Sequence, residues 1–221
     1  MTEAHPSPFD PMSTNTSSEP WPPADCPSLA WPALADQADR LAWYRAVITA
    51  YALLWEGHVT QARFAPVTEQ ELAALESRLG CRLPPALRAY HRELGALSLA
   101  ETLCSVSGKK PTIPIAPLLE AYPGVVDRAE SEADMALAQK MVAFGDYLGN
   151  GNMFCFHRAT GEVYYFDHDS GAMLTRFFPS PEDYLDALMI RCLAEIHEDD
   201  ETGEQLLIQR HGKPLVEKWL Y

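Results

Sequence analysis

MVAFGDYLGNGNMFCFHRATGEVYYFDHDSGAMLTRF, residues 141–177, is the stretch that decides the fold. It alternates short runs of aromatic and β-branched residues with turns rich in glycine, asparagine and aspartate, which tolerate positive φ angles. The predicted strands are Met141–Phe144, Met153–His157, Val163–Phe166 and a run at about Met173–Phe177. Because the turns between them are short, the pattern predicts an antiparallel meander.

Helices are predicted on both sides of the meander. Leu41, Tyr44 and Ile48 recur at helical spacing, and Thr68 with Glu71 has the form of a capping box. The expected helices are Asp36–Glu56, Thr68–Gly80, Pro84–Gly95, Glu130–Gln139 and Ser180–Cys192, with a short edge strand at Thr112–Pro117. This order predicts a single α+β domain with a mostly antiparallel sheet flanked by helices, and not a doubly wound parallel sheet.

The chain divides by composition into a domain and two appendages. Residues 1–35 are rich in proline and serine and predict a disordered tail, which Trp21 and Trp31 are candidates to anchor. Residues 36–195 hold the predicted domain, with its central part at about 66–193. Residues 196–221 form an acidic C-terminal extension that ends in a short apolar piece.

The net charge bears on the kind of partner. The chain has 31 acidic and 17 basic side chains, a formal net charge of -14 and a sequence pI near 4.8, so nucleic acid is a poor partner. A surplus of carboxylates attracts cationic surfaces and accelerates encounter with them. The alternative is that the charge serves solubility alone.

Cysteine usage and the N-terminus favour the cytoplasm. The cysteines at positions 26, 81, 104, 155 and 192 are odd in number and lack CxxC spacing, which is typical of free thiols in a reducing compartment. A signal peptide requires a positively charged start and an apolar run, and residues 1–39 contain no Lys or Arg and no apolar run. The apolar stretch Leu41–Trp55 is shorter than a membrane-spanning helix, so no membrane association is expected.

Catalytic readings of the sequence are weak. His157 and the run Asp167-His168-Asp169 carry metal-ligating groups, but consecutive residues fan out in a turn and seldom bind one ion. Cys155 lies in an apolar strand, where a thiol is buried rather than activated. No phosphate-binding loop, dinucleotide fingerprint, GxSxG or HExxH occurs. We therefore expect neither an enzyme nor a bound metal or cofactor.

Two parts of the sequence together resemble the SUKH superfamily, which includes SMI/KNR-type regulators and many bacterial immunity proteins. The first is TExELxxLExxLGxxLPxxLxxY at residues 68–90. The second contains the turn from Phe144-Gly145-Asp146 to Gly151-Asn152, the strands around Phe154 and Val163, and Asp167-His168-Asp169. The chain departs from the family pattern at Leu94-Gly95-Ala96, where an Asn-Gly turn is usual, and at Asn152, where aspartate is common.

The resemblance implies a binding domain without an established catalytic centre. In many bacterial members it implies an immunity protein that binds and neutralises a cognate secreted toxin, such as a nuclease or a deaminase with a basic active-site cleft. An acidic protein can occupy such a cleft in place of the phosphate backbone. The alternatives are an intracellular scaffold or regulatory protein of the SMI/KNR kind and, more remotely, an enzyme that uses the Asp167-His168-Asp169 turn. The oligomeric state stays open.

Candidate partner-binding residues fall in two groups. Loop side chains on a rigid sheet commonly carry recognition, and the acidic run after the last domain helix is a candidate for contacting a cationic partner, although a solvated tail is the alternative. The first group is Asp146, Tyr147, Asn150, Asn152, Asp167 and Asp169, and the second is Glu195, Glu198, Asp199, Asp200 and Glu201.

Overall fold

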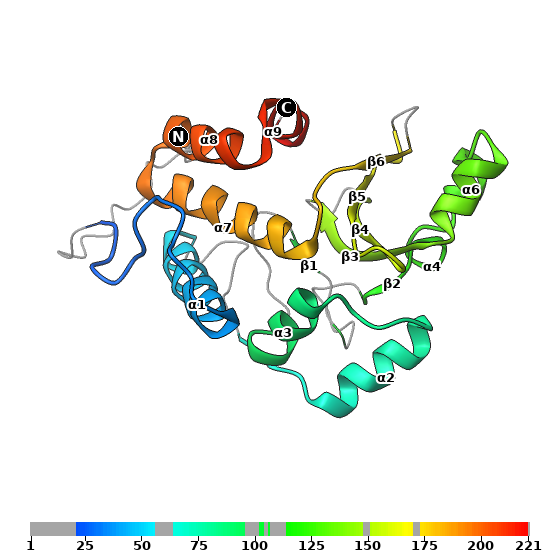
Figure 1. Ribbon diagram of the computed structural model, residues 1–221, viewed down its shortest axis with the longest axis horizontal. Helices are drawn as coiled ribbons and strands as arrows, with labels where there is room; N and C mark the ends of the chain where they lie inside the picture. The colour runs from blue at the N-terminus through cyan, green and yellow to red at the C-terminus, as the bar shows by residue number, and fades with distance from the viewer. Residues whose placement is uncertain are drawn as a thin grey trace, which may run out of the picture.

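The computed structural model describes residues 21–55, 64–95, 102–103, 106, 114–147, 151–169 and 173–220. Its centre is a six-stranded antiparallel sheet, with helices on both faces, as Figure 1 shows. The predicted α+β class, with an antiparallel sheet and an added N-terminal helix, is confirmed. Residues 1–20 of the predicted disordered tail lie outside the described residues.

The sheet follows the predicted meander. Its strands are β1 (Thr102–Leu103), β2 (Ala116–Pro117), β3 (Met141–Tyr147), β4 (Asn152–His157), β5 (Val163–Phe166) and β6 (Leu174–Arg176). The strands β3 to β6 pair in chain order, while β1 and β2 both pair with the other edge of β3. A bulge between Ala143 and Gly145 shifts the register of β3 against β4. Because bulges twist a strand, this one redirects the end of β3 that leads into the glycine-rich turn.

Both faces of the sheet are buried, so alternate residues of one strand serve different cores. Phe154 and Phe156 of β4 pack in the larger core, whereas Met153 and Cys155 pack in the smaller one. The smaller core is covered by α4 (Leu118–Ala121), α5 (Val125–Arg128) and α6 (Glu132–Ala138). The larger core lies against α1 (Gln37–Leu54), α2 (Glu69–Leu79), α3 (Pro85–Glu93) and α7 (Pro181–His197). Full burial of an aromatic or large aliphatic side chain contributes about 2 kcal/mol, so these layers stabilise the sheet.

Local sequence signals set the ends of the predicted helices. Asp36 caps α1, and the predicted capping box is present, because the Thr68 side chain accepts from Glu71 while the Glu71 carboxylate accepts from the Thr68 amide. Gly80 ends α2 in the left-handed conformation, as glycine does at low cost. The last core helix, α7, continues to His197, five residues beyond the predicted Cys192.

The chain beyond Cys192 is helical and packed, which corrects the alternative of a solvated acidic tail. It finishes α7 and then forms α8 (Asp200–His211) and α9 (Lys213–Leu220). Helix α8 lies along α7 in Figure 1, and α9 packs against α8. Leu207, Val216 and Trp219 are at most 5% exposed and belong to the larger core. The division of the chain into a tail, a domain and an extension stays a prediction.

Residues 21–35 contact these C-terminal helices. The indole N–H of Trp21 donates to the Ile196 carbonyl at 2.8 Å, and that of Trp31 donates to the Leu206 carbonyl at 3.1 Å. Arg210 stacks over Trp31, with its guanidinium carbon 4.3 Å from the ring centre. Both tryptophans therefore attach the segment before α1 to α7 and α8, as the sequence suggested.

Acidification is expected to destabilise the protein through His91. This α3 side chain is 1% exposed, and burial lowers its pKa to about 4. In the unfolded chain the His91 side chain has its ordinary, higher pKa, so the unfolded state binds more protons below about pH 6.5. The free energy of unfolding therefore falls as the pH falls. For His91 alone, linkage gives a loss of about 2 kcal/mol from pH 7.5 to pH 5. Urea unfolding at both pH values measures the loss.

The control for this loss is His91→Phe, which keeps the edge contact with Tyr90 and cannot titrate. The variant should retain only a smaller pH dependence, to which His211 contributes in the same direction because burial lowers its pKa also. An unchanged pH dependence in His91→Phe would show that other groups cause the acid loss.

Candidate partner-binding surface

The first predicted group of binding residues surrounds the hairpin between β3 and β4. Asp146 and Tyr147 are the last residues of β3, where they pair with Met153 and Asn152. Asn150 lies outside the described residues. The sheet thus fixes the backbone at both ends of the glycine-rich turn.

Asn152 has an internal role, and the prediction that it is exposed is wrong. Asn152 is only 9% exposed, and its side-chain Oδ1 accepts a hydrogen bond from the His168 amide at 3.0 Å. The same oxygen lies 2.7 Å from Nδ1 of His168. A buried amide side chain that pairs with backbone in this way joins the β3–β4 hairpin to the turn after β5.

The turn after β5 is closed by its own aspartates. Oδ1 of Asp167 accepts from the Asp169 amide at 2.9 Å, which is the Asx-turn expected for this residue type. The Asp169 carboxylate lies 3.2 Å from Nε2 of His168, whose ring also stands 5.6 Å from the Tyr122 ring. With 77% of its side chain exposed, Asp169 is directed to solvent. We call Asn152 and Asp167–Asp169 the turn cluster.

Two of the side chains considered for catalysis, His157 and Cys155, are hydrogen-bonded within a turn or buried in the core. Nδ1 of His157 accepts from the amides of Ala159 and Thr160, both at 3.2 Å, so it caps the β4–β5 turn. Cys155 is fully buried, and burial raises the pKa of its thiol. Within the described residues, no three histidine, cysteine or acidic side chains gather as a metal site would need. His157 thus orders a turn of the sheet, and Cys155 packs in the smaller core.

The second predicted group forms the corner between α7 and α8. Glu198 takes the left-handed conformation with φ of 53° and turns the chain, and Asp199 then caps α8 by accepting from the Thr202 amide at 3.0 Å. Hydrogen bonding to Thr202 lowers the pKa of Asp199. The corner carries exposed carboxylates in succession at 198, 199, 200 and 201, with Glu195 one turn earlier. We call these residues the acidic corner: Glu195, Glu198, Asp199, Asp200 and Glu201.

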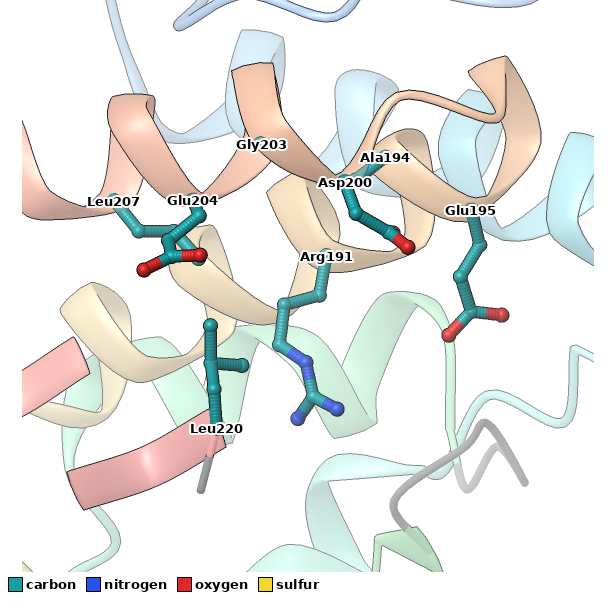
Figure 2. Close-up of a pocket in the computed structure, with 8 residues that line it drawn as sticks. All are labelled: Arg191, Ala194, Glu195, Asp200, Gly203, Glu204, Leu207 and Leu220. Atoms are coloured by element: carbon teal, nitrogen blue, oxygen red, sulfur yellow. The ribbon is translucent and has the colours of Figure 1, made fainter. Parts of the chain in front are cut away.

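A close approach of two helices gives the acidic corner its shape. A Cβ built on Gly203 of α8 would lie 2.5 Å from the Cβ of Ala194, so glycine allows α8 to pack directly on α7. Beside this contact lies a pocket of about 210 Å³. It is lined by Arg191, Ala194, Glu195, Asp200, Gly203, Glu204, Leu207 and Leu220 (Figure 2). The structure therefore places part of the acidic corner on the rim of a hollow.

Arg191 occupies the middle of this pocket. Its side chain extends between Leu220 and Glu195 in Figure 2, and its guanidinium carbon stands 4.8 Å from the centre of the Trp219 ring. A cation among the carboxylates of Glu195, Asp200 and Glu204 offsets part of their charge inside the pocket. Glu198, Asp199 and Glu201 do not line the pocket, and their side chains are exposed.

Two exposed tryptophans border the acidic corner, and the sequence interpretation assigned neither to a binding surface. Trp21 is 43% exposed and Trp55 is 40% exposed, whereas Trp43 and Trp219 are buried. The position of Trp21 in a proline-rich segment and of Trp55 at the end of a helix, just before Gly57, was the available sequence signal. Both indole rings therefore keep apolar surface in contact with solvent.

The architecture defines an α+β domain, with an antiparallel meander between two layers of helices. The family model described as the SMI1/KNR4 family (SUKH-1) matches residues 66–187, more than half of the chain. The chain belongs to this family. No curated protein and no solved structure matched it.

The family match divides the candidate residues. It begins just before α2 and ends inside α7, so it includes the turn cluster. The acidic corner and both exposed tryptophans lie outside it. In the part of the chain that is described, no helix has the length and apolarity to cross a bilayer.

Proposed function

We propose that this protein is a bacterial immunity protein that acts in the cytoplasm and binds and neutralises a cognate secreted toxin. Membership of the SUKH-1 family supports this proposal, because many bacterial members of the superfamily have this role. The proposed mechanism is occlusion: the protein covers the toxin's active-site cleft and performs no chemistry of its own. A nuclease or a deaminase with a basic cleft is the class of toxin that fits.

The observation that carries the proposal is the acidic corner. Exposed carboxylates at four successive positions, on a chain of net charge -14, create a concentrated negative field at one place. The corner is held rigidly, because α7 and α8 pack through Gly203 and the core beneath them. A rigid array of carboxylates resembles a phosphate backbone to a cationic cleft and loses little entropy on binding.

Co-expression with the toxin encoded beside this gene tests the function. Cells that produce the toxin should survive only when the full-length protein is present, and the two proteins should co-purify. If no adjacent gene encodes a toxin that this protein neutralises, and pulldown recovers regulators from the cell instead, the SMI/KNR-type scaffold role replaces the immunity role.

Neutralising the acidic corner is expected to slow association with the toxin. The variant Glu198→Gln/Asp200→Asn/Glu201→Gln removes three exposed charges and keeps the cap at Asp199 and the Tyr51 bond of Glu195. Because steering acts on encounter, the association rate at low salt should fall by about tenfold, with a weaker salt dependence. Stopped-flow mixing with an inactive toxin measures both quantities.

The matched control removes the same charge from the opposite helical layer. Asp127, Glu130 and Glu132 are also exposed, and they belong to the α5–α6 region over the smaller core. Their replacement by Asn, Gln and Gln should change the association rate by less than twofold. Equal slowing by the two triple variants would mean that net charge alone, and not the acidic corner, drives the encounter.

A further inference from the structure

The last turn of α7 is flanked by aromatic side chains from two segments that are distant in sequence. Trp21 donates to the Ile196 carbonyl across a separation of 175 positions. On α1, the Tyr51 hydroxyl donates to Oε2 of Glu195 at 2.8 Å, and Trp55 hydrogen bonds to that hydroxyl. The Tyr51 and Trp55 rings are 6.4 Å apart. Trp21, Trp55 and the start of the acidic corner are thereby assembled around one helix end.

Packing holds these side chains in place and still leaves the two tryptophans partly exposed to solvent. Helix α1 runs beside α7 in Figure 1, and their packing fixes where Trp55 lies. Tyr51 is buried, and this burial is the main reason that its pKa is raised; Cys192 and Glu195 raise it further. The Tyr51 hydroxyl therefore stays protonated and donates to Glu195. Both tryptophans nevertheless leave about two-fifths of their surface exposed. Side chains that are held in place but not covered are suited to act as anchors for a partner.

The chemistry of the assembly selects a cationic side chain. Aromatic faces of tryptophan attract a guanidinium or ammonium group, and carboxylates within reach form ion pairs with it. Glu195 and Glu198 supply carboxylates, and α7 adds the negative end of its dipole at its C-terminus. Arginine is the best match, because its planar group both stacks on a ring and pairs with a carboxylate.

We propose that Trp21, Trp55, Glu195 and Glu198 form the main anchor for the partner and that the partner contributes an arginine-bearing surface. We call these residues the aromatic–acidic surface. This inference rests on the proposed immunity function and adds to it the place of binding. All of these residues lie outside the family match, so partner choice resides in the segments that this chain adds to the family domain.

The turn cluster is the competing surface, and its structure favours it less. Asn152 is buried and bonded to His168, and Asp167 accepts from the Asp169 amide, so their polar groups are engaged within the protein. Asp169 remains the outward side chain there. The comparison of the two surfaces therefore needs one variant in each.

The experiment measures the dissociation constant of the full-length protein for an inactive form of the toxin encoded beside the gene. Trp21→Ala, Trp55→Ala and Glu198→Arg should each weaken binding by at least tenfold, and Asp169→Arg by less than threefold. Val126→Ala, at a residue that is 61% exposed in the α5 layer, is the control and should leave binding unchanged. Circular dichroism melting checks folding; if a tryptophan variant unfolds, the exposed Glu198→Arg substitution still tests the surface.

The outcomes separate the two proposals. If the wild type binds and protects but only Asp169→Arg weakens binding, the aromatic–acidic surface is wrong and the immunity function stands. If the wild type neither binds nor protects, both proposals fail. Light scattering provides a further arm: a wild-type dimer that Trp55→Ala dissociates would show that a second copy of the chain covers this surface, which would also overturn the inference.

Discussion

Asp186→Ala is expected to lower the free energy of unfolding by about 3 kcal/mol, since it removes the buried carboxylate that Tyr44, Arg40 and Arg210 share. Asp186 is 1% exposed, and its Oδ1 accepts from the Tyr44 hydroxyl at 2.6 Å and from Nε of Arg40 at 3.1 Å. Its Oδ2 lies 3.3 Å from Nη2 of Arg210. Denaturant unfolding monitored by tryptophan fluorescence measures the loss.

The control is a substitution of the second carboxylate that Arg40 contacts. Nη1 of Arg40 also lies 3.1 Å from Glu182, whose side chain is 40% exposed. An exposed ion pair contributes below about 1 kcal/mol, so Glu182→Gln should cost little. Asp186→Asn, which keeps an acceptor oxygen and the side-chain shape, should fall between the two. A loss for Asp186→Ala no larger than that for Glu182→Gln would contradict the role assigned to the buried carboxylate.

Gly95→Ala is expected to cost about 3 kcal/mol, the sum of a strained backbone and a steric collision. Gly95 has φ of +78°, and a Cβ built there would stand 1.9 Å from the carbonyl oxygen of Ala65. That oxygen belongs to the backbone and cannot swing aside, and the Ala65 amide is itself bonded to the Leu94 carbonyl at 3.0 Å. Thermal and denaturant unfolding both report the loss.

Gly80→Ala isolates the steric part of this effect. Gly80 has a similar φ of +67°, but a Cβ there would meet nothing within 4 Å. It should therefore cost only the strain of the left-handed region, about 1 kcal/mol. Equal losses for the two alanine variants would show that the contact between residues 65 and 95 is loose in solution.

At Gly95 and Asp186 the structure gives reasons that the family pattern alone does not. Gly95 occupies a position where the chain departs from the usual Asn-Gly turn, and the glycine there is required by the approach of Ala65. Asp186 lies near the end of the family match, yet Arg40 and Arg210 come from outside it. The added helices α1 and α8 are thus tied to the family domain through one carboxylate.

Much of the candidate site was beyond sequence reasoning. The acidic run was recognisable, but whether it formed a free tail or a helical corner depended on Leu207, Val216 and Trp219 packing against α7. Asn152 in a glycine-rich turn was predicted to be exposed, although its position beside His168 buries it. Trp21 and Trp55 were assigned to anchoring and helix roles, because a position in a proline-rich segment or at a helix end does not show how much of a ring stays exposed.

The sequence by itself determined the elements whose causes are local. The Thr68–Glu71 capping box, the left-handed Gly80 and the alternation of aromatic residues in Met153–His157 act over a few positions, so each is readable in a short window. Only the tertiary structure decided which surface the elements present. Asp186 meets Arg40 across 146 positions and Glu195 meets Tyr51 across 144, and such pairings depend on how whole helices pack. The free energy that selects them comes from burial of the joint core, which no single segment encodes.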